Sequence, residues 1–477
     1  MSFHLNLRSY EQALQGVPVV VDVLDDSLRV VDQRTVHVNQ RSSFDLPSGQ
    51  YALQVTLPSG DRLTETVTST PGSPDHDIAL WEISPHESMQ RTVVLKSGPA
   101  SGSRRFTEPG FQSLWVRLWA RVSGVWRVGS WPRAVAYWDD DAVVYVFPTG
   151  RRPHMLQIGG PRIPWRMVSL PAADELEVTV QPAGDEQTPD VTLTVATNDN
   201  LAEATLGYLT VGAVTHAGLI SDQAEGLLYR KTENPAGAAV GGYFLLRTSS
   251  LERLHNWPRN LANWMQWMPD GALIHAWQLI REQQESREPV PARLDEAREL
   301  LLATVERGLP VYTEGLRLLV SGLKLFDFQA EGADPEIRDA LDRIRPFVAA
   351  ADLTQPTTTF LGSSPSVAST APAYGLPHSR RGLAIVYDVA VADLVPLGLV
   401  EAGASLRLSR PPAIGPAEAQ MTPHGTVRLA DGREFTDLFA AAAAANRPDI
   451  WHSWVAEDSG PLAVARDRAR RGQLPPP

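Results

Sequence analysis

Apolar residues recur at intervals of three and four in the stretch from Ala224 to Phe326. The pattern starts at Trp264, Trp267 and Met268 and breaks at Pro269-Asp270-Gly271. It then continues at Leu273, Ile274, Trp277, Leu300, Leu301, Thr304, Leu316, Leu319, Val320 and Leu323. This spacing puts the apolar side chains on one face of each of several helices. Because a single amphipathic helix is marginal in water, we expect these helices to pack together as a bundle over residues 221–351.

Residues 1–97 and 111–220 follow a different pattern, of short runs rich in β-branched residues that are separated by turn formers. Residues 46–55, for example, alternate apolar and polar side chains after a Pro-Ser-Gly turn. We therefore predict two β-sandwich-like domains, joined by a Gly- and Ser-rich linker. The runs in the first domain resemble prealbumin-like sandwiches, which implies a non-catalytic docking module.

Residues 352–381 are dense in Thr, Ser, Pro and Ala, a composition that predicts a disordered linker. The segment ends on the basic pair Arg380 and Arg381, which makes it a candidate cleavage site. Residues 389–472 then predict a small α+β module. The fold class predicted for the whole chain is therefore α+β and multidomain.

The composition of the 477 residues is that of an ordinary water-soluble protein, with 43% hydrophobic and 21% charged residues. No apolar run is long enough to cross a bilayer, and the first residues lack the layout of a signal peptide. The absence of cysteine excludes disulfides and thiolate chemistry. We expect a cytoplasmic protein that makes no membrane contact, and its net charge of -12 disfavours indiscriminate binding to nucleic acid.

The second β-rich domain carries a locally basic segment. Residues 101–170 contain ten arginines against four acidic residues, together with six tryptophans. Strand alternation places Trp115, Arg117 and Trp119 on one face, and Arg121 and Arg127 follow nearby. Such a face could bind a polyanion or an acidic partner through ion pairing and stacking. Alternatively, the tryptophans fill the core and the arginines are solvated.

Two segments resemble known families. The phrases AAVGGYFLLR, NLANWMQWMPDGALIHAW and ARELLLATVERGLPVYTEGLRLLVSGL resemble helical segments of proteins from bacterial conflict systems that encode caspase-like or CHAT-type peptidases. This resemblance implies a peptidase as the protein partner.

The C-terminal module resembles a RAMA (restriction enzyme adenine methylase-associated) domain through matching positions at Gly398, Leu399, Gly403, Leu406, Gly425, Val427, Asp431, Gly432, Phe435, Ala440, Ala441, Trp451, Trp454, Leu462 and Arg466. The resemblance implies DNA recognition, with Trp451, Trp454 and Arg466 as candidate ligand-binding residues. Two departures from the family pattern, at residues 437–439 and at Asp449-Ile450, affect the expected anion contact.

No motif for catalysis is present. The chain has no nucleophile elbow, phosphate-binding loop, dinucleotide fingerprint or zinc-protease helix, so we predict no catalytic, cofactor or metal residues. The preferred hypothesis is a non-enzymatic adaptor or sensor of a bacterial defence system that docks a peptidase and recognises DNA. The alternatives are a proteolytic substrate that releases an active fragment, and an enzyme whose site is assembled across domains.

Overall fold

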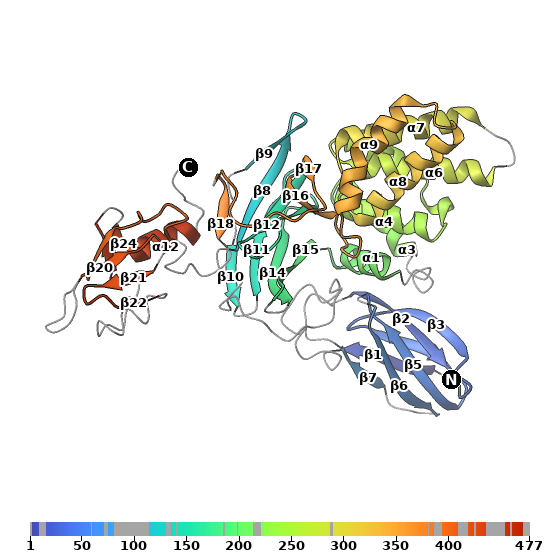
Figure 1. The fold of residues 1–477 in the computed structure, drawn as a ribbon. Coiled ribbons are helices and arrows are strands. Elements are labelled where there is room, and N and C mark those ends of the chain that lie inside the picture. The colour runs from blue at the N-terminus through green and yellow to red at the C-terminus, as the bar shows by residue number, and fades with distance from the viewer. Residues whose placement is uncertain are drawn as a thin grey trace.

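The computed structural model describes residues 2–8, 16–58, 60–70, 75–80, 114–129, 135–139, 142–184, 187–197, 199–212, 221–286, 290–379, 381–385, 394–408, 418–423, 426–435, 454–457 and 460–470 (Figure 1). These residues form strand-rich sheets, a group of helices and a small C-terminal module, so the predicted α+β multidomain class is confirmed. None of their helices is long and apolar enough to span a membrane.

The N-terminal domain consists of two facing sheets. One has the strand order β4-β1-β7 and the other β3-β2-β5-β6. Their strands are β1 (Ser2–Arg8), β2 (Pro18–Leu24), β3 (Val30–His37), β4 (Arg41–Asp45), β5 (Gly49–Thr56), β6 (Arg62–Ser69) and β7 (His76–Ala79). Alternate residues such as Leu5, Val21 and Leu53 point inward and are fully buried, as period-2 patterning requires.

The second β-rich domain is also built from two sheets. A four-stranded sheet has the order β10-β11-β14-β15, and a seven-stranded sheet has the order β17-β16-β13-β12-β8-β18, with β9 pairing β8. The strands contributed by this domain are β8 (Trp115–Val122), β9 (Val125–Val128), β10 (Val135–Asp139), β11 (Ala142–Phe147), β12 (His154–Gly159), β13 (Arg166–Leu170), β14 (Leu176–Gly184) and β15 (Pro189–Thr197).

Three strands of the seven-stranded sheet come from the segment predicted to be a linker or from just after it. They are β16 (Thr359–Ser364), β17 (Val367–Ala368) and β18 (Leu383–Ile385). β16 pairs with β13, and β18 pairs with β8, both antiparallel. We call residues 359–379 and 381–385 the return segment. The prediction of disorder was wrong here because Phe360 is 1% exposed and packs edge-on against Phe347, with 5.2 Å between ring centroids.

The helices form one bundle with a continuous apolar core. They are α1 (Asn200–Val211), α3 (Ser221–Tyr229), α4 (Pro235–Arg247), α5 (Trp257–Trp264), α6 (Pro269–Glu285), α7 (Pro291–Arg307), α8 (Thr313–Gln329) and α9 (Pro335–Ala350). Proline opens several of them, where its missing N–H costs nothing. Gly242 lets α4 approach α6 closely, since a Cβ at this position would lie 2.9 Å from Ile274.

The bundle starts earlier than the sequence pattern predicted. α1 was placed in the second β domain, but Leu206, Tyr208 and Leu209 belong to the core of the bundle. The same helix contacts the N-terminal domain, because the Tyr208 hydroxyl donates to the carbonyl of Thr56 at 2.9 Å. α1 is therefore shared between the bundle and the first sandwich.

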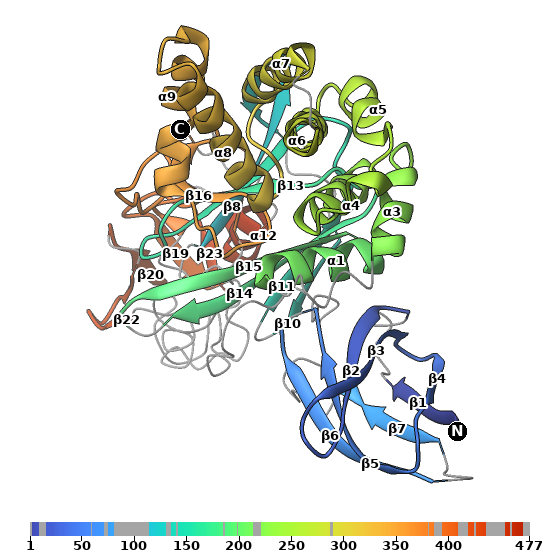
Figure 2. The ribbon, with the colours of Figure 1, turned by 90° about the vertical axis from the view of Figure 1, so that its right-hand side faces the viewer.

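The seven-stranded sheet is covered on both faces. Its first face packs against the four-stranded sheet through residues such as Val116, Val143 and Val178. Met155, Met167 and Phe360 pack instead with Ala350, at the end of α9, and with the nearby Phe347. The result is a layered arrangement of sheet, sheet and helices (Figure 2).

The C-terminal module contains a small sheet with the order β22-β21-β20-β19-β23-β24 and one helix. Its elements are β19 (Ser405–Leu408), β20 (Glu418–Met421), β21 (Val427–Leu429), β22 (Glu434–Phe435), β23 (Trp454–Ala456), β24 (Gly460–Pro461) and α12 (Leu462–Arg470). The described part of this module therefore mixes strands with a helix. The alanine-rich stretch at 440–446 lies outside the described residues.

Candidate functional site

The predicted Arg/Trp face is covered by the chain itself. Arg117 lies 5.8 Å and 5.9 Å from the ring centroids of Trp115 and Trp119, as strand alternation predicted. However, Trp115 is fully buried and Arg117 is 4% exposed. The Arg117 guanidinium donates to the carbonyl of Ser379, while the Trp115 indole donates to the carbonyl of Gly375 at 2.8 Å. The prediction of an accessible face was wrong for these two residues, because the return segment occupies it.

Arg121 and Arg127 lie near the β8–β9 turn but in different environments. The Arg121 guanidinium donates to the carbonyls of Arg307 and Glu306, at the C-terminal end of α7. Helix C-termini carry unpaired carbonyls and partial negative charge, so a cation is stabilised there. Arg127 is exposed, and Trp119 is half-buried with its indole donating to Gln157 at 3.0 Å. Of the three predicted arginines, Arg127 is the one that a polyanion could reach.

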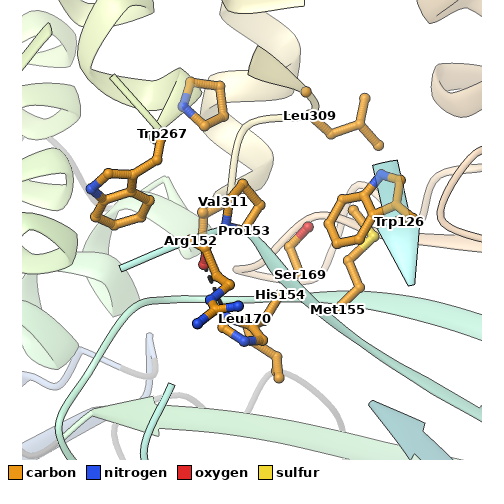
Figure 3. Close-up of a pocket in the computed structure, with 12 residues that line it drawn as sticks. Trp126, Arg152, Pro153, His154, Met155, Ser169, Leu170, Trp267, Leu309 and Val311 are labelled. Carbon is orange, nitrogen blue, oxygen red and sulfur yellow. Dashed lines mark hydrogen bonds between the residues drawn. The ribbon is translucent and has the colours of Figure 1, made fainter. Parts of the chain in front are cut away.

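A small cavity of about 10 Å³ lies where the seven-stranded sheet meets the bundle (Figure 3). Trp126 of β9 and Trp267, between α5 and α6, lie on opposite sides of it, and Met155 and Leu309 contribute apolar walls. The Ser169 hydroxyl faces this junction, is buried, and has no hydrogen-bond partner in the described part of the chain.

The cavity places a serine and a histidine near each other in space but not in reacting geometry. Met155 pairs with Ser169 and His154 with Leu170, so Ser169 and His154 point to opposite faces of the sheet. The Nδ1 atom of His154 lies 2.9 Å from the carbonyl of Arg152, and burial lowers the pKa of the imidazole. The pair therefore does not form a nucleophile and base of the kind that covalent catalysis needs.

A group of aromatic side chains surrounds a lysine at another corner of the bundle. Lys231, in the loop between α3 and α4, has its ammonium 6.0 Å from the ring of Tyr229, 5.3 Å from Trp257 and 5.6 Å from Trp264. Tyr229 and Trp257 contact each other edge-on, with 5.5 Å between centroids. We call these four residues the aromatic–lysine cluster.

The cluster combines a covered cation with exposed rings. Lys231 is 5% exposed, whereas Tyr229 is 67% exposed and Trp264 is 57% exposed. Helical periodicity assigned Trp264 to the buried stripe, but α5 ends at this residue and turns it outward. Desolvation by the surrounding side chains lowers the pKa of the Lys231 ammonium. The arrangement can bind through stacking, cation–π contact and charge.

Buried carboxyl groups elsewhere in the bundle have structural partners. Asp270 is fully buried, accepts from the Tyr243 hydroxyl at 2.8 Å and from the Val311 amide at 2.9 Å, and has a pKa raised by burial to about 6. Glu203 accepts from the amide and hydroxyl of Thr197 at 2.6 Å and 2.8 Å. Burial raises its pKa to about 7. Both groups tie elements together inside the fold.

An open, largely acidic pocket lies beside Glu203, lined by Thr149, Arg151, Ala172, Ala173, Asp174, Glu175, Thr197, Asp199, Glu233, Asn234 and Pro235. Asp199 already has a structural task, because it caps α1 and accepts from the Asn234 amide at 2.9 Å. No group of three or more histidine or acidic side chains is arranged to hold a metal ion in the described ranges.

The remaining predicted site residues belong to the C-terminal module and to the segment before it. Trp454 is fully buried in the C-terminal module, and Arg466 is half-buried on α12. Trp451 and Arg380 lie outside the described residues. Arg381 is exposed at the start of the turn that leads into β18. Of the predicted C-terminal ligand residues, Trp454 is therefore part of the core.

A family model described as the Y4kD C-terminal domain matches residues 204–408. This range contains most of the bundle, the return segment and the first strand of the C-terminal module. All four residues of the aromatic–lysine cluster lie within it. No curated protein and no solved structure matches the chain. The resemblances to RAMA domains and to caspase-associated proteins stay predictions.

Sequence reasoning missed the aromatic–lysine cluster. Helical spacing favoured a buried core for the tryptophans at 257, 264, 267 and 277, with a ligand pocket as the alternative, and it did not single out Tyr229 or Lys231. One signal was available, since the chain has only three lysines and one of them follows a tyrosine between two helices. The convergence of that loop with α5 depends on tertiary packing that periodicity does not reveal.

Proposed function

We propose that the chain is a non-enzymatic adaptor that docks a partner protein on its helical bundle. The observation that supports this proposal is the aromatic–lysine cluster, where Tyr229 and Trp264 expose large ring surfaces next to a fixed cation. Aromatic residues are enriched at the energetic centres of protein interfaces. Single exposed rings are common on protein surfaces, whereas several rings gathered around one charge are typical of recognition sites.

The finer assignments rest on the sequence resemblances. We propose that the adaptor belongs to a bacterial defence system, that its partner is a caspase-like or CHAT-type peptidase, and that the C-terminal module recognises DNA. The layered construction supports the adaptor role, because the sheets of the second β-rich domain lie between the bundle on one side and the small module on the other (Figure 1).

Co-expression of the full chain with a caspase-like or CHAT-type peptidase from the same genome tests this proposal. We expect the two proteins to co-elute on size exclusion, and the double substitution Tyr229→Ala, Trp264→Ala to weaken the complex at least about tenfold, as hot-spot truncation does. The matched control is Phe328→Ala, because Phe328 is also exposed, at 83%, but lies on α8 outside the cluster. A complex that tolerates the double substitution as well as the control substitution would refute docking at this surface.

A second candidate function is that of a proteolytic substrate. Arg381 supports it, because this residue is exposed between the anchored part of the return segment and β18. A cut after Arg381 would separate the C-terminal module from the helical bundle in sequence. Incubation of the full chain with the same peptidase, followed by mass spectrometry, would detect such a product.

A further inference from the structure

We infer that the aromatic–lysine cluster is a docking site for an acidic segment of a partner protein, with Lys231 as the anchor for a carboxylate. This inference rests on the proposed docking function and adds to it the chemistry of the partner. It depends on three features of the described residues, namely the position of the ammonium, the engagement of nearby acids and the exposure of the rings.

The ammonium of Lys231 is held in place by its surroundings. Three rings lie between 5.3 Å and 6.0 Å from its nitrogen, and they come from the end of α3 and from α5. The loop is fixed at its end by Asn234, whose side-chain oxygen accepts from the Gly237 amide at 2.8 Å and caps α4. A lysine fixed in this way loses little further conformational entropy when a ligand binds.

Among the residues that the structure describes, no acidic side chain pairs with the ammonium of Lys231. In the described part of the chain, the interactions of its ammonium are those with the three rings. The carboxylates of Glu225 and Asp199 are engaged with other partners. Glu225 contacts Arg253 at 3.1 Å and His255 at 3.0 Å, and Asp199 contacts Arg230 at 3.5 Å. An acceptor that reaches the small exposed part of Lys231 would therefore meet an ammonium that none of these carboxylates engages.

These features favour an anionic partner over a cationic one. A second ammonium or guanidinium group that sought the same rings would meet repulsion from Lys231, which already occupies them. A carboxylate would instead supply the missing counter-charge in a partly desolvated setting, where such a pair is stronger than on an open surface. The exposed faces of Tyr229 and Trp264 would then cover apolar side chains that flank the acid in the partner.

A selection from a random twelve-residue peptide library displayed on phage tests the inference and does not require that the partner be identified first. The full chain serves as bait, and the Tyr229→Ala, Trp264→Ala variant serves for counter-selection. We expect the recovered peptides to be enriched in Asp and Glu next to aromatic or aliphatic residues. The strongest peptide is then synthesised with a fluorescent label, and its affinity is measured by anisotropy.

The substitution Lys231→Met should lower the affinity for this peptide by about tenfold or more. The methionine side chain keeps the packing of the lysine stem but removes the charge. Lys324→Met is the matched control, since Lys324 is an exposed lysine on α8 far along the chain, and it should leave the affinity unchanged. Circular dichroism checks that both variants fold.

The outcomes separate the inference from the function on which it rests. The selection of basic peptides would overturn the inference and leave docking at the rings intact. The same conclusion would follow if peptide binding survived Lys231→Met but was lost when the rings were removed. Failure to recover any peptide that distinguishes the native chain from the counter-selection variant would contradict both the inference and docking at this surface.

Discussion

The carboxyl groups of Asp270 and Glu203 share a physical property, because burial raises the pKa of each one above its ordinary value. In the pH range between its unfolded and folded pKa values, such a group binds a proton in the native state and has lost it in the unfolded state. Its contribution to stability is therefore present at low pH and is lost as the pH rises through the folded pKa. For Glu203 the window runs from 4.5 to about 7.

The substitution Glu203→Gln should remove this dependence. We expect the variant to match the native chain near pH 4 and to exceed it above pH 7 by about 1–3 kcal/mol in free energy of unfolding. Urea unfolding at pH 4, 5.5 and 8 measures the difference. The control is Glu233→Gln, because Glu233 is a glutamate with an exposed side chain. A variant that is less stable than the native chain at pH 8 would contradict the sign.

Arg121 and Arg127 permit a second comparison at the level of single residues. Arg121→Ala leaves the carbonyls of Glu306 and Arg307 without their donor, so we expect a loss of about 1–3 kcal/mol in stability. Arg127→Ala should change stability by less than about 0.5 kcal/mol, because its side chain is exposed. Thermal unfolding of the two variants checks this. Equal losses of stability in the two variants would mean that Arg121 does not connect the sheet to the bundle.

At the scale of elements, the return segment shows why composition led to a wrong prediction of disorder. A stretch rich in Thr, Ser and Pro predicts disorder when it is considered alone, because it cannot bury enough apolar surface. Here β13 offers an open edge with unpaired amides and carbonyls, and β16 completes it. One large side chain, that of Phe360, then supplies the anchor between Met155, Met167 and Phe347.

Hydrogen exchange should detect this pairing. We expect the amides of Thr359–Ser364 that face β13 to exchange slowly, at rates similar to those of β12 and β13 in the same sheet. The exposed strand β17, at the edge of the sheet, provides an internal comparison and should exchange faster. If the amide of Phe360 exchanged at the rate of an unstructured peptide, the result would contradict this pairing and support the prediction of a disordered linker.

At the scale of the whole molecule, the predictions succeeded where the signal was local. Helical periodicity found the bundle, and strand alternation found both sandwiches and placed Arg117 between Trp115 and Trp119. What covers that face could not be predicted, since Ser379 meets Arg117 across 262 residues of sequence. The exposure of Trp264 and the convergence of Lys231 on three rings likewise depend on how separate helices meet.

The return of the chain to β13 and β8 has a consequence for synthesis. A ribosome that adds residues from the N-terminus delivers β8, β12 and β13 well before β16 and β18, and the entire bundle is made in between. Until about residue 385 has left the ribosomal tunnel, two edges of the growing sheet lack their neighbours, and open edges of this kind attract other strands. The nascent protein thus passes through a vulnerable interval whose length is set by the time needed to translate the helices.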